Sequence, residues 1–238
     1  AAVRGPRVDR PITPPGEAQP ADELPPPGPA NTQIVAGPYG GAMAVLGTGA
    51  TITRPSFAAN NDVWAVVDGK PTRWAGGENR PVVVGTEALE AVAKGSIQEL
   101  QVSPDGVRVA LIVAGQVLFA VIETADDGRV VLAHPRFAAF NIGNRAVALD
   151  WASPTTVVVA RDAAETPVTQ VPVSGLPAAG QVTGNLAPPV RAVAANLSAT
   201  YVADSRGVLK LSSSARDRGQ TWVDVPAAKG PDMIPVMP

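Results

Sequence analysis

The sequence predicts an all-β protein with the β-propeller fold, built from blades of the WD40 or TolB-like type. The first observation behind this prediction is the stretch 97–123, which reads as consecutive short strands joined by tight turns. Its apolar and β-branched residues favour strands, whereas a helix would need apolar residues at three-to-four spacing and no Pro-Asp-Gly inside it. The expected strands are 97–103, 107–113 and 116–122.

The second observation is that weaker copies of this stretch recur along the chain. When the copies are aligned on the small residue that ends the first strand, they lie 45, 49 and 44 residues apart. A repeating unit of about 40–50 residues made of strands and turns is typical of a propeller blade. The sequence therefore indicates about four recognisable blades plus a partial one. The aligned residues are Ala58, Ser103, Ala152 and Asn196.

Turn residues support these strand boundaries. Pro104 fixes φ at the first turn, and Asp105-Gly106 tolerates the positive φ that follows. Ala114-Gly115 forms the next turn, and Asp68-Gly69 is a hairpin turn in the preceding unit. Each of these turns separates two runs that read as strands, so the blade pattern rests on turn chemistry as well as on apolar residues.

The chain divides into two parts. Residues 1–30 contain nine prolines, so we expect a proline-rich extended segment or linker, with a ligand for another domain's aromatic groove as the alternative. Residues 31–238 form the predicted propeller domain, which starts with an incomplete blade whose strand covers 42–46. Residues 86–93 form a short surface helix or an irregular connection. Later units are expected at 52–84, 97–134, 146–173 and 191–225, with a long loop at 136–145.

The composition excludes several classes of function. The formal net charge is −2 at pH 7 and the charges are mixed, so there is no basic face for nucleic acid. The chain has no cysteine, which excludes disulfides, thiolate metal sites and cysteine nucleophiles within these residues. No apolar run reaches the roughly 18 residues of a membrane span, and the start has no signal-peptide core. Alanine at position 1 suggests a fragment or a mature form.

No catalytic constellation is visible in the sequence. The one histidine, His134, is interpreted as a structural or surface residue, because no G-x-S-x-G elbow accompanies it and one histidine cannot build a multi-histidine site. Asp126-Asp127-Gly128 resembles part of a calcium loop, but a hairpin turn explains it better. Glu87, Glu90 and Glu99 have no spacing that selects a catalytic pair. We therefore predict no catalytic residue, no cofactor and no metal.

Two arginines are the candidate partner-contact or channel-mouth residues. Arg54 and Arg191 both lie near the start of a predicted inner strand, and inner strands line the central channel of a propeller. For both, the alternative is an ion pair or hydrogen bond to a neighbouring blade. Tryptophans recur at strand positions, where packing between blades explains them better than a ligand-stacking site. These are Trp64, Trp74, Trp151 and Trp222.

Several stretches, taken in order, resemble the C-terminal propeller of the actinobacterial LpqB lipoprotein family. No single motif is diagnostic, but the ordered set covers most of residues 42–238. The resemblance implies an exported lipoprotein on the outer face of the cytoplasmic membrane. Its lipidated N-terminal cysteine and germination-protein-like domains are not seen in this chain, which would then be a soluble fragment. The matching segments are 52–69 (ITRPSFAANNDVWAVVDG), 100–122, 147–175 and 188–211.

The resemblance further implies a non-enzymatic accessory role in signalling. The family is linked to the Mtr two-component system, so the propeller loops would bind and modulate the extracytoplasmic domain of its sensor histidine kinase. The alternative is a cell-envelope propeller that binds or hydrolyses glycan or lipid, for which we expect a polar channel mouth with several carboxylates. The chain contains fewer units than the family's propeller implies. We therefore expect closure of the ring by the N-terminal segment, or missing residues, since an open ring leaves strand edges unpaired.

Overall fold

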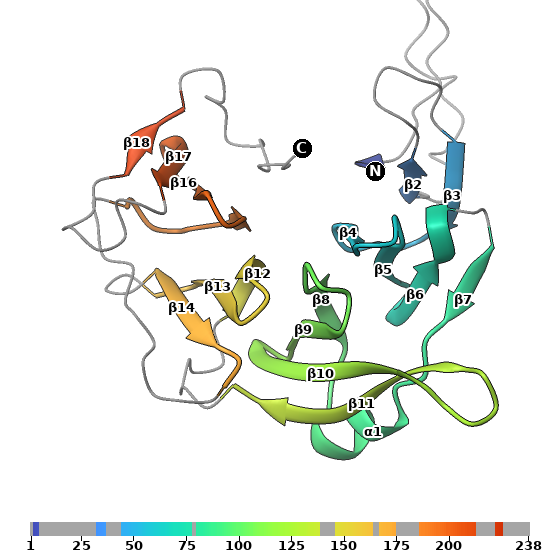
Figure 1. Ribbon diagram of the computed structural model, residues 1–238. Helices are drawn as coiled ribbons and strands as arrows, with labels where there is room; N and C mark the ends of the chain where they lie inside the picture. The colour runs from blue at the N-terminus through green and yellow to red at the C-terminus, as the bar shows by residue number, and fades with distance from the viewer. Residues whose placement is uncertain are drawn as a thin grey trace, which may run out of the picture.

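Five antiparallel β-sheets fan out around a common axis in the computed structural model (Figure 1). We name them blades 1 to 5 in chain order. The β-propeller that the sequence predicts is therefore confirmed, and no helix crosses the stretch that founded the prediction. The structure describes residues 2–4, 32–36, 44–77, 80–138, 146–163, 167–174, 186–212 and 222–225.

The blades share one plan, in which strands that follow each other in the chain are neighbours in the sheet. Blade 1 consists of β1 (Ala2–Arg4), β2 (Thr32–Ala36) and β3 (Ala44–Gly49). Blade 2 consists of β4 (Ser56–Phe57), β5 (Val63–Val67), β6 (Lys70–Trp74) and β7 (Pro81–Val83). Blade 3 consists of β8 (Ile97–Val102), β9 (Arg108–Val113), β10 (Gln116–Thr124) and β11 (Val130–Phe137). Blade 4 consists of β12 (Ala146–Ser153), β13 (Thr156–Arg161) and β14 (Val168–Pro172). Blade 5 consists of β15 (Ala192–Ala195), β16 (Ala199–Asp204), β17 (Gly207–Ser212) and β18 (Val223–Asp224).

Two short helical segments accompany the sheets. The 3-10 turn η1 (Ala75–Gly77) follows β6, and α1 (Glu87–Val92) links blade 2 to blade 3. Helix α1 lies where the sequence allowed a short helix, and it places Leu89 in the core between these blades. Figure 1 shows β4, β8 and β12 nearest the axis and β7, β11, β14 and β18 at the periphery. Because each blade starts at its inner strand, residues at the starts of inner strands gather at one end of the axis.

The turns adopt the backbone that their residues favour. Gly106 has φ 72° after Pro104-Asp105, and the Ala114-Gly115 turn has φ 50° and 75°. The hairpin between β5 and β6 has φ 48° at Asp68 and 81° at Gly69, the pair of positive angles that a tight hairpin needs. Each predicted turn therefore connects the two strands expected on either side of it.

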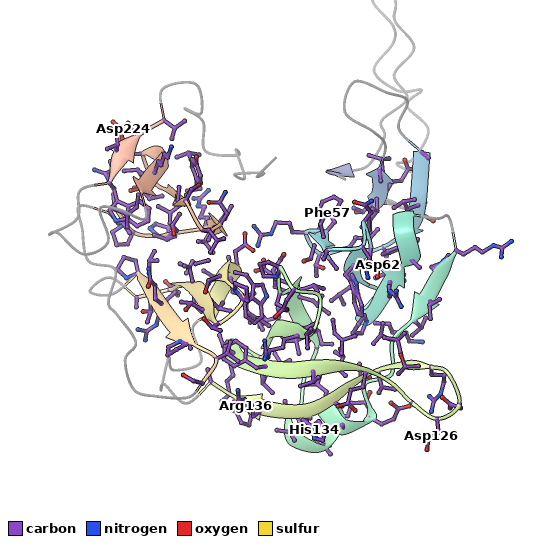
Figure 2. The ribbon with its side chains drawn as sticks, in the orientation of Figure 1. Phe57, Asp62, Asp126, His134, Arg136 and Asp224 are labelled. Atoms are coloured by element: carbon purple, nitrogen blue, oxygen red, sulfur yellow. The ribbon has the colours of Figure 1, made fainter. Side chains whose placement is uncertain are left out.

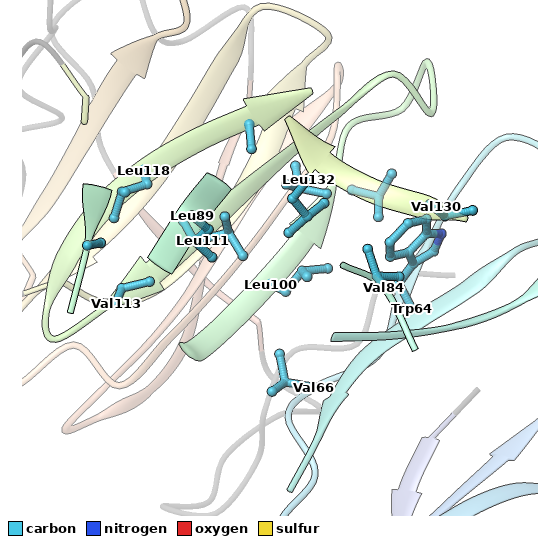
Figure 3. Close-up of a cluster of buried hydrophobic side chains, with 14 residues drawn as sticks. Trp64, Val66, Val84, Leu89, Leu100, Leu111, Val113, Leu118, Val130 and Leu132 are labelled. Atoms are coloured by element: carbon cyan, nitrogen blue, oxygen red, sulfur yellow. The ribbon is translucent and has the colours of Figure 1, made fainter. Parts of the chain in front are cut away.

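Apolar clusters between adjacent blades hold the fan together. Figure 3 shows the largest, where side chains of blade 2 meet those of blade 3 and α1. Burying a large aliphatic or aromatic side chain contributes about 1.5–3 kcal/mol, so each junction is a substantial part of the stability. The cluster consists of Trp64, Val66, Val84, Leu89, Ala93, Leu100, Val102, Val109, Leu111, Val113, Leu118, Ala120, Val130 and Leu132.

The tryptophans pack between blades, as the sequence predicts. Trp74 of blade 2 lies against blade 1 and donates from Nε1 to the Leu46 carbonyl at 2.8 Å. Trp151 of blade 4 donates from Nε1 to the Gln101 carbonyl of blade 3 at 2.9 Å. Each of these indole rings is therefore buried between two blades, and its N–H group donates a hydrogen bond to the preceding blade.

The structure differs from the prediction at several places along the chain. In blade 1, β2 was not expected, and β3 covers Ala44–Gly49, where a strand was expected at 42–46. Residues 2–4, which precede the first proline, form β1 and pair with β2, although the prediction gave 1–30 to an extended segment. Strand β11 runs to Phe137, where a loop was expected from 136. It passes Pro135 because the β10–β11 register shifts between Phe119 and Val121 and His134 takes φ 51°. A bulge of this kind accommodates a proline inside a strand.

We expect Gly47→Ala to destabilise the chain by about 1–3 kcal/mol, the usual cost of overpacking a core. A Cβ at Gly47 would lie 2.8 Å from a ring carbon of Trp74. Urea denaturation measures the loss. In a Trp74→Phe background the same substitution should cost less, because phenylalanine lacks the second ring. An equal cost in both backgrounds would contradict the contact.

Candidate functional site

Arg54 lies just before β4 and links four blades near the axis. Its guanidinium donates to the Val193 carbonyl of blade 5 and to the Leu149 carbonyl of blade 4, both at 2.7 Å. It also donates to Glu99 Oε1 of blade 3 at 2.8 Å, and it lies 3.8 Å from Asp150 Oδ2 of blade 4. A guanidinium presents its five donors in a fixed fork, which suits such a multiple contact. We name Arg54, Glu99 and Asp150 the axial cluster.

Glu99 is the buried member of the axial cluster. It belongs to β8 and is 8% exposed. Its Oε1 accepts from Arg54 and, at 3.4 Å, from the Gln101 amide. Its Oε2 accepts the backbone N–H of Leu149 at 3.2 Å. Both carboxylate oxygens are therefore engaged, and they tie the inner strand of blade 3 to that of blade 4.

Asp150 of β12 makes the corresponding link to the next blade. Its Oδ2 accepts the backbone N–H of Ala195 in blade 5 at 3.0 Å, and its Oδ1 accepts that of Trp151 at 2.8 Å. Ser56 in blade 2 plays a similar part, because its hydroxyl accepts the backbone N–H of Val102 in blade 3 at 2.8 Å. Polar side chains of the inner strands thus fasten each of these blades to its successor.

Burial and charge shift the titration of both carboxyl groups. Burial raises the pKa of Glu99 from 4.5 to about 7, and the nearby Asp150 raises it as well, while Arg54 and the hydrogen bonds lower it. Burial also raises the pKa of Asp150, opposed first by the charge of Arg54. Removing charge from water disfavours the ionised form of an acid, and a neighbouring cation restores it only in part.

The model of the lipoprotein LpqB beta-propeller domain family matches residues 25–238. This chain belongs to that family. Relatives include lipoprotein LpqB of Mycolicibacterium smegmatis strain mc(2)155, 38% identical over 95% of this chain, and of Mycobacterium tuberculosis strain CDC 1551, 35% identical over 85%. The resemblance that the sequence suggested is thereby confirmed. The chain spans 38% and 35% of the length of these two relatives.

A solved structure supports the fold of this LpqB-family propeller. The β-propeller domain of Cps50 (Swd1) from Myceliophteria thermophila matches with a TM-score of 0.52 at 9% identity. The match covers 84% of this chain and 67% of that domain. At such low identity the likeness shows the propeller fold and nothing about function. In the described part of the chain, no helix has the length and apolar character needed to traverse a bilayer.

The structure separates the two arginines that the sequence singled out in this LpqB-family chain. Arg54 takes part in the axial cluster and hydrogen-bonds to neighbouring blades. Arg191 lies just before β15 with an exposed side chain, and its backbone N–H donates to the Ala203 carbonyl at 2.8 Å. A role for either arginine in contacting a partner or lining a channel mouth stays a prediction.

His134 and the acidic turn 126–128, which were also weighed from the sequence, lie away from the axis. Figure 2 shows His134 and Asp126 at the periphery of blade 3. The side chain of His134 is 75% exposed and lies 3.2 Å from Glu123 Oε1. The Asp126-Asp127-Gly128 segment is a hairpin turn in which the N–H of Gly128 donates to the Ala125 carbonyl. The structure therefore places His134 at the surface and this acidic pair in a turn.

A surface pocket lies beside α1 and is lined by charged side chains. It has a volume of about 430 Å³ and is bounded by β7, α1 and the β10–β11 hairpin. Glu87 forms an ion pair with Arg129 at 3.1 Å there, and Arg129 also pairs with Asp127 at 2.6 Å. The lining carries two basic and two acidic side chains, whose formal charges sum to zero, so it presents no net formal charge to a ligand. Its other charged lining residues are Lys70 and Glu90.

Sequence reasoning missed the axial cluster as a unit. It named Arg54 and Glu99 for separate reasons and did not consider Asp150. A signal was present, because Arg54 and Glu99 each precede the aligned residue of their repeat by four positions, and Asp150 precedes its own by two. A charged residue inside an apolar inner strand, at a similar place in successive copies, would have predicted that these side chains meet at the axis.

Proposed function

We propose that this chain is a non-enzymatic interaction module of an exported lipoprotein anchored at the outer face of the cytoplasmic membrane. It binds and modulates the extracytoplasmic domain of the sensor histidine kinase of the Mtr two-component system. Membership of the LpqB family supports this proposal, because the relatives are named as lipoproteins. The propeller supplies a rigid frame whose loops can contact a partner.

The observation that carries this proposal is a set of exposed apolar side chains at one end of the axis. Phe57, Val107 and Leu197 are 50%, 45% and 71% exposed. Phe57 is the last residue of β4, whereas Val107 and Leu197 lie between the inner and second strands of their blades. Figure 2 shows Phe57 close to the axis. Such connections share one end of the propeller. Apolar side chains surrounded by a polar rim are typical anchors of a protein interface.

The carboxylate oxygens of the axial cluster already accept hydrogen bonds from the protein, which favours a non-enzymatic role over hydrolysis. A hydrolytic site needs a carboxylate that can reach a substrate or a water molecule. Both oxygens of Glu99 accept hydrogen bonds from protein groups, and both oxygens of Asp150 accept backbone N–H groups. These hydrogen bonds give the two carboxylates a structural role, because they hold neighbouring blades together. Binding or hydrolysis of envelope glycan or lipid remains the alternative proposal.

Isothermal titration calorimetry of this chain against the kinase's extracytoplasmic domain tests the proposal. We expect binding in the micromolar range, and a Phe57→Ser or Leu197→Ser variant should weaken it about tenfold or more, equivalent to about 1.4 kcal/mol. Val223→Ser is the matched control, because Val223 is 64% exposed on the peripheral strand β18.

Two results would contradict the proposal in different ways. No heat at high micromolar concentration with either this chain or the full-length lipoprotein would refute the partner. Heat with the full-length lipoprotein but none with this chain would place the contact with the kinase outside this chain. If Val223→Ser and Phe57→Ser weaken binding equally, the kinase domain remains the partner, but the proposed end of the propeller is not its docking surface.

A further inference from the structure

The axial cluster has an unbalanced charge when all its members are ionised. Arg54 is one cation, and it faces two carboxylates, Glu99 at 2.8 Å and Asp150 at 3.8 Å. Glu99 is buried, so solvent does little to screen the excess negative charge. When two carboxylates face a single partly buried cation, one of them is expected to retain its proton to a higher pH than an isolated carboxyl does.

The elements packed against β8 bring no further charge to Glu99. Strands β4 and β5 carry no ionisable side chain, and the one ionisable side chain of β12 is that of Asp150. Strand β9 carries Arg108, but Arg108 is the first residue of that strand, next to the Val109 that pairs with Val102, and it forms an ion pair with Asp105 at 3.3 Å. Arg54 and Asp150 are therefore the charged groups that face Glu99 in the described part of the chain.

We propose that protonation of Glu99 stabilises the junction of blades 2, 3 and 4, and we call this effect the proton lock. With a proton on Glu99, Arg54 and Asp150 balance each other and the inner strands are held most firmly. When the proton leaves, a second negative charge remains in the buried axis and the junction weakens. This inference concerns the propeller itself and does not depend on the proposed kinase partner.

The direction of the pH effect follows from the environment of Glu99. Its pKa in the folded chain is about 7, raised by burial from an ordinary value of 4.5. Between these two values the folded state holds more protons than the unfolded state, so its stability falls as pH rises through this window. The contribution is present in full at the acidic end of the window and is lost above neutral pH.

Carbon-13 NMR of the glutamate side-chain carboxyls tests the proton lock directly in the wild-type chain. We expect one glutamate carboxyl to titrate near pH 7, well above the range that is usual for glutamate. Glu99→Gln should remove that signal and so assign it. Asp150→Asn should shift its midpoint to lower pH, because the Asp150 charge helps to retain the proton. If every glutamate titrates below about pH 5, the proton lock does not exist.

The pH dependence of urea unfolding tests the consequence for the fold. We expect the wild-type midpoint to decrease between about pH 5 and about pH 8, and the Glu99→Gln midpoint to lack this decrease, whatever its absolute value. Glu87→Gln is the matched control, because Glu87 is exposed on α1 and its removal should leave the slope of the wild type. The same slope in wild type and Glu99→Gln would overturn the proposal.

Discussion

Replacing Arg54 with methionine is expected to destabilise the propeller by about 3 kcal/mol at slightly alkaline pH. Removing one partner of a buried ion pair costs about 3–5 kcal/mol, and the lower figure applies because the Arg54 side chain is 22% exposed. The loss has two parts. Glu99 and Asp150 would lose the cation that faces them, and the carbonyls of Leu149 and Val193 would each lose a donor.

The pH dependence of the Arg54→Met variant distinguishes lost charge from lost packing. Arg54 lowers the pKa of both Glu99 and Asp150, so without it both carboxyls retain protons to higher pH. The destabilisation measured by urea unfolding should therefore be smaller near pH 5 than near pH 8, by about 1 kcal/mol or more. If Arg54→Met destabilises the chain equally at both pH values, the destabilisation comes from lost packing and not from lost charge.

Arg191→Met is the matched control for this experiment. Both arginines lie just before an inner strand, but the Arg191 side chain is exposed, whereas that of Arg54 bonds to three other blades. An exposed substitution of this kind is expected to change stability by no more than about 0.5 kcal/mol. A loss at Arg191 equal to that at Arg54 would mean that position before an inner strand, and not the axial cluster, determines the effect.

The sequence predicts the parts of this fold that depend on neighbours in the chain. The turn at Pro104-Asp105-Gly106, the hairpin at Asp68-Gly69 and the strands beside them are fixed by local backbone preferences. The repeat of these units then indicates blades, because a single three- or four-stranded sheet with two apolar faces needs another on each side. The buried tryptophans follow from the same argument.

The features that the sequence could not predict depend on contacts across the ring. Glu99 meets Leu149 of the next blade, and Arg54 reaches Val193 of blade 5. The repeated position of the charged residues indicates that they reach the axis, but no local pattern records which strand of another blade each of them contacts. The extension of β11 past Pro135 was also missed, since proline normally ends a strand unless a bulge accommodates it. Strand β1 is only three residues long and gains its partner, β2, from beyond residue 31.

Trp74→Ala is expected to destabilise the chain by about 3–5 kcal/mol, the usual cost of removing a buried aromatic side chain. Trp74 is 1% exposed and belongs to the core between blades 1 and 2, together with Ile34, Leu46 and Val63. Alanine would leave a cavity between two sheets whose positions are set by hydrogen bonds within each blade, so the site cannot collapse fully. Urea unfolding followed by circular dichroism measures the loss.

Phenylalanine substitutions at Trp74 and Trp64 separate packing from hydrogen bonding. Both residues are 1% exposed. Trp74 donates to the Leu46 carbonyl, whereas the Trp64 indole nitrogen has no hydrogen-bond partner in the described structure. Trp74→Phe removes a bond between blades, while Trp64→Phe removes a donor that is already unsatisfied. We expect Trp74→Phe to cost more than Trp64→Phe by about 0.5–1.5 kcal/mol. A larger loss at Trp64 would show that ring volume outweighs the bond to blade 1.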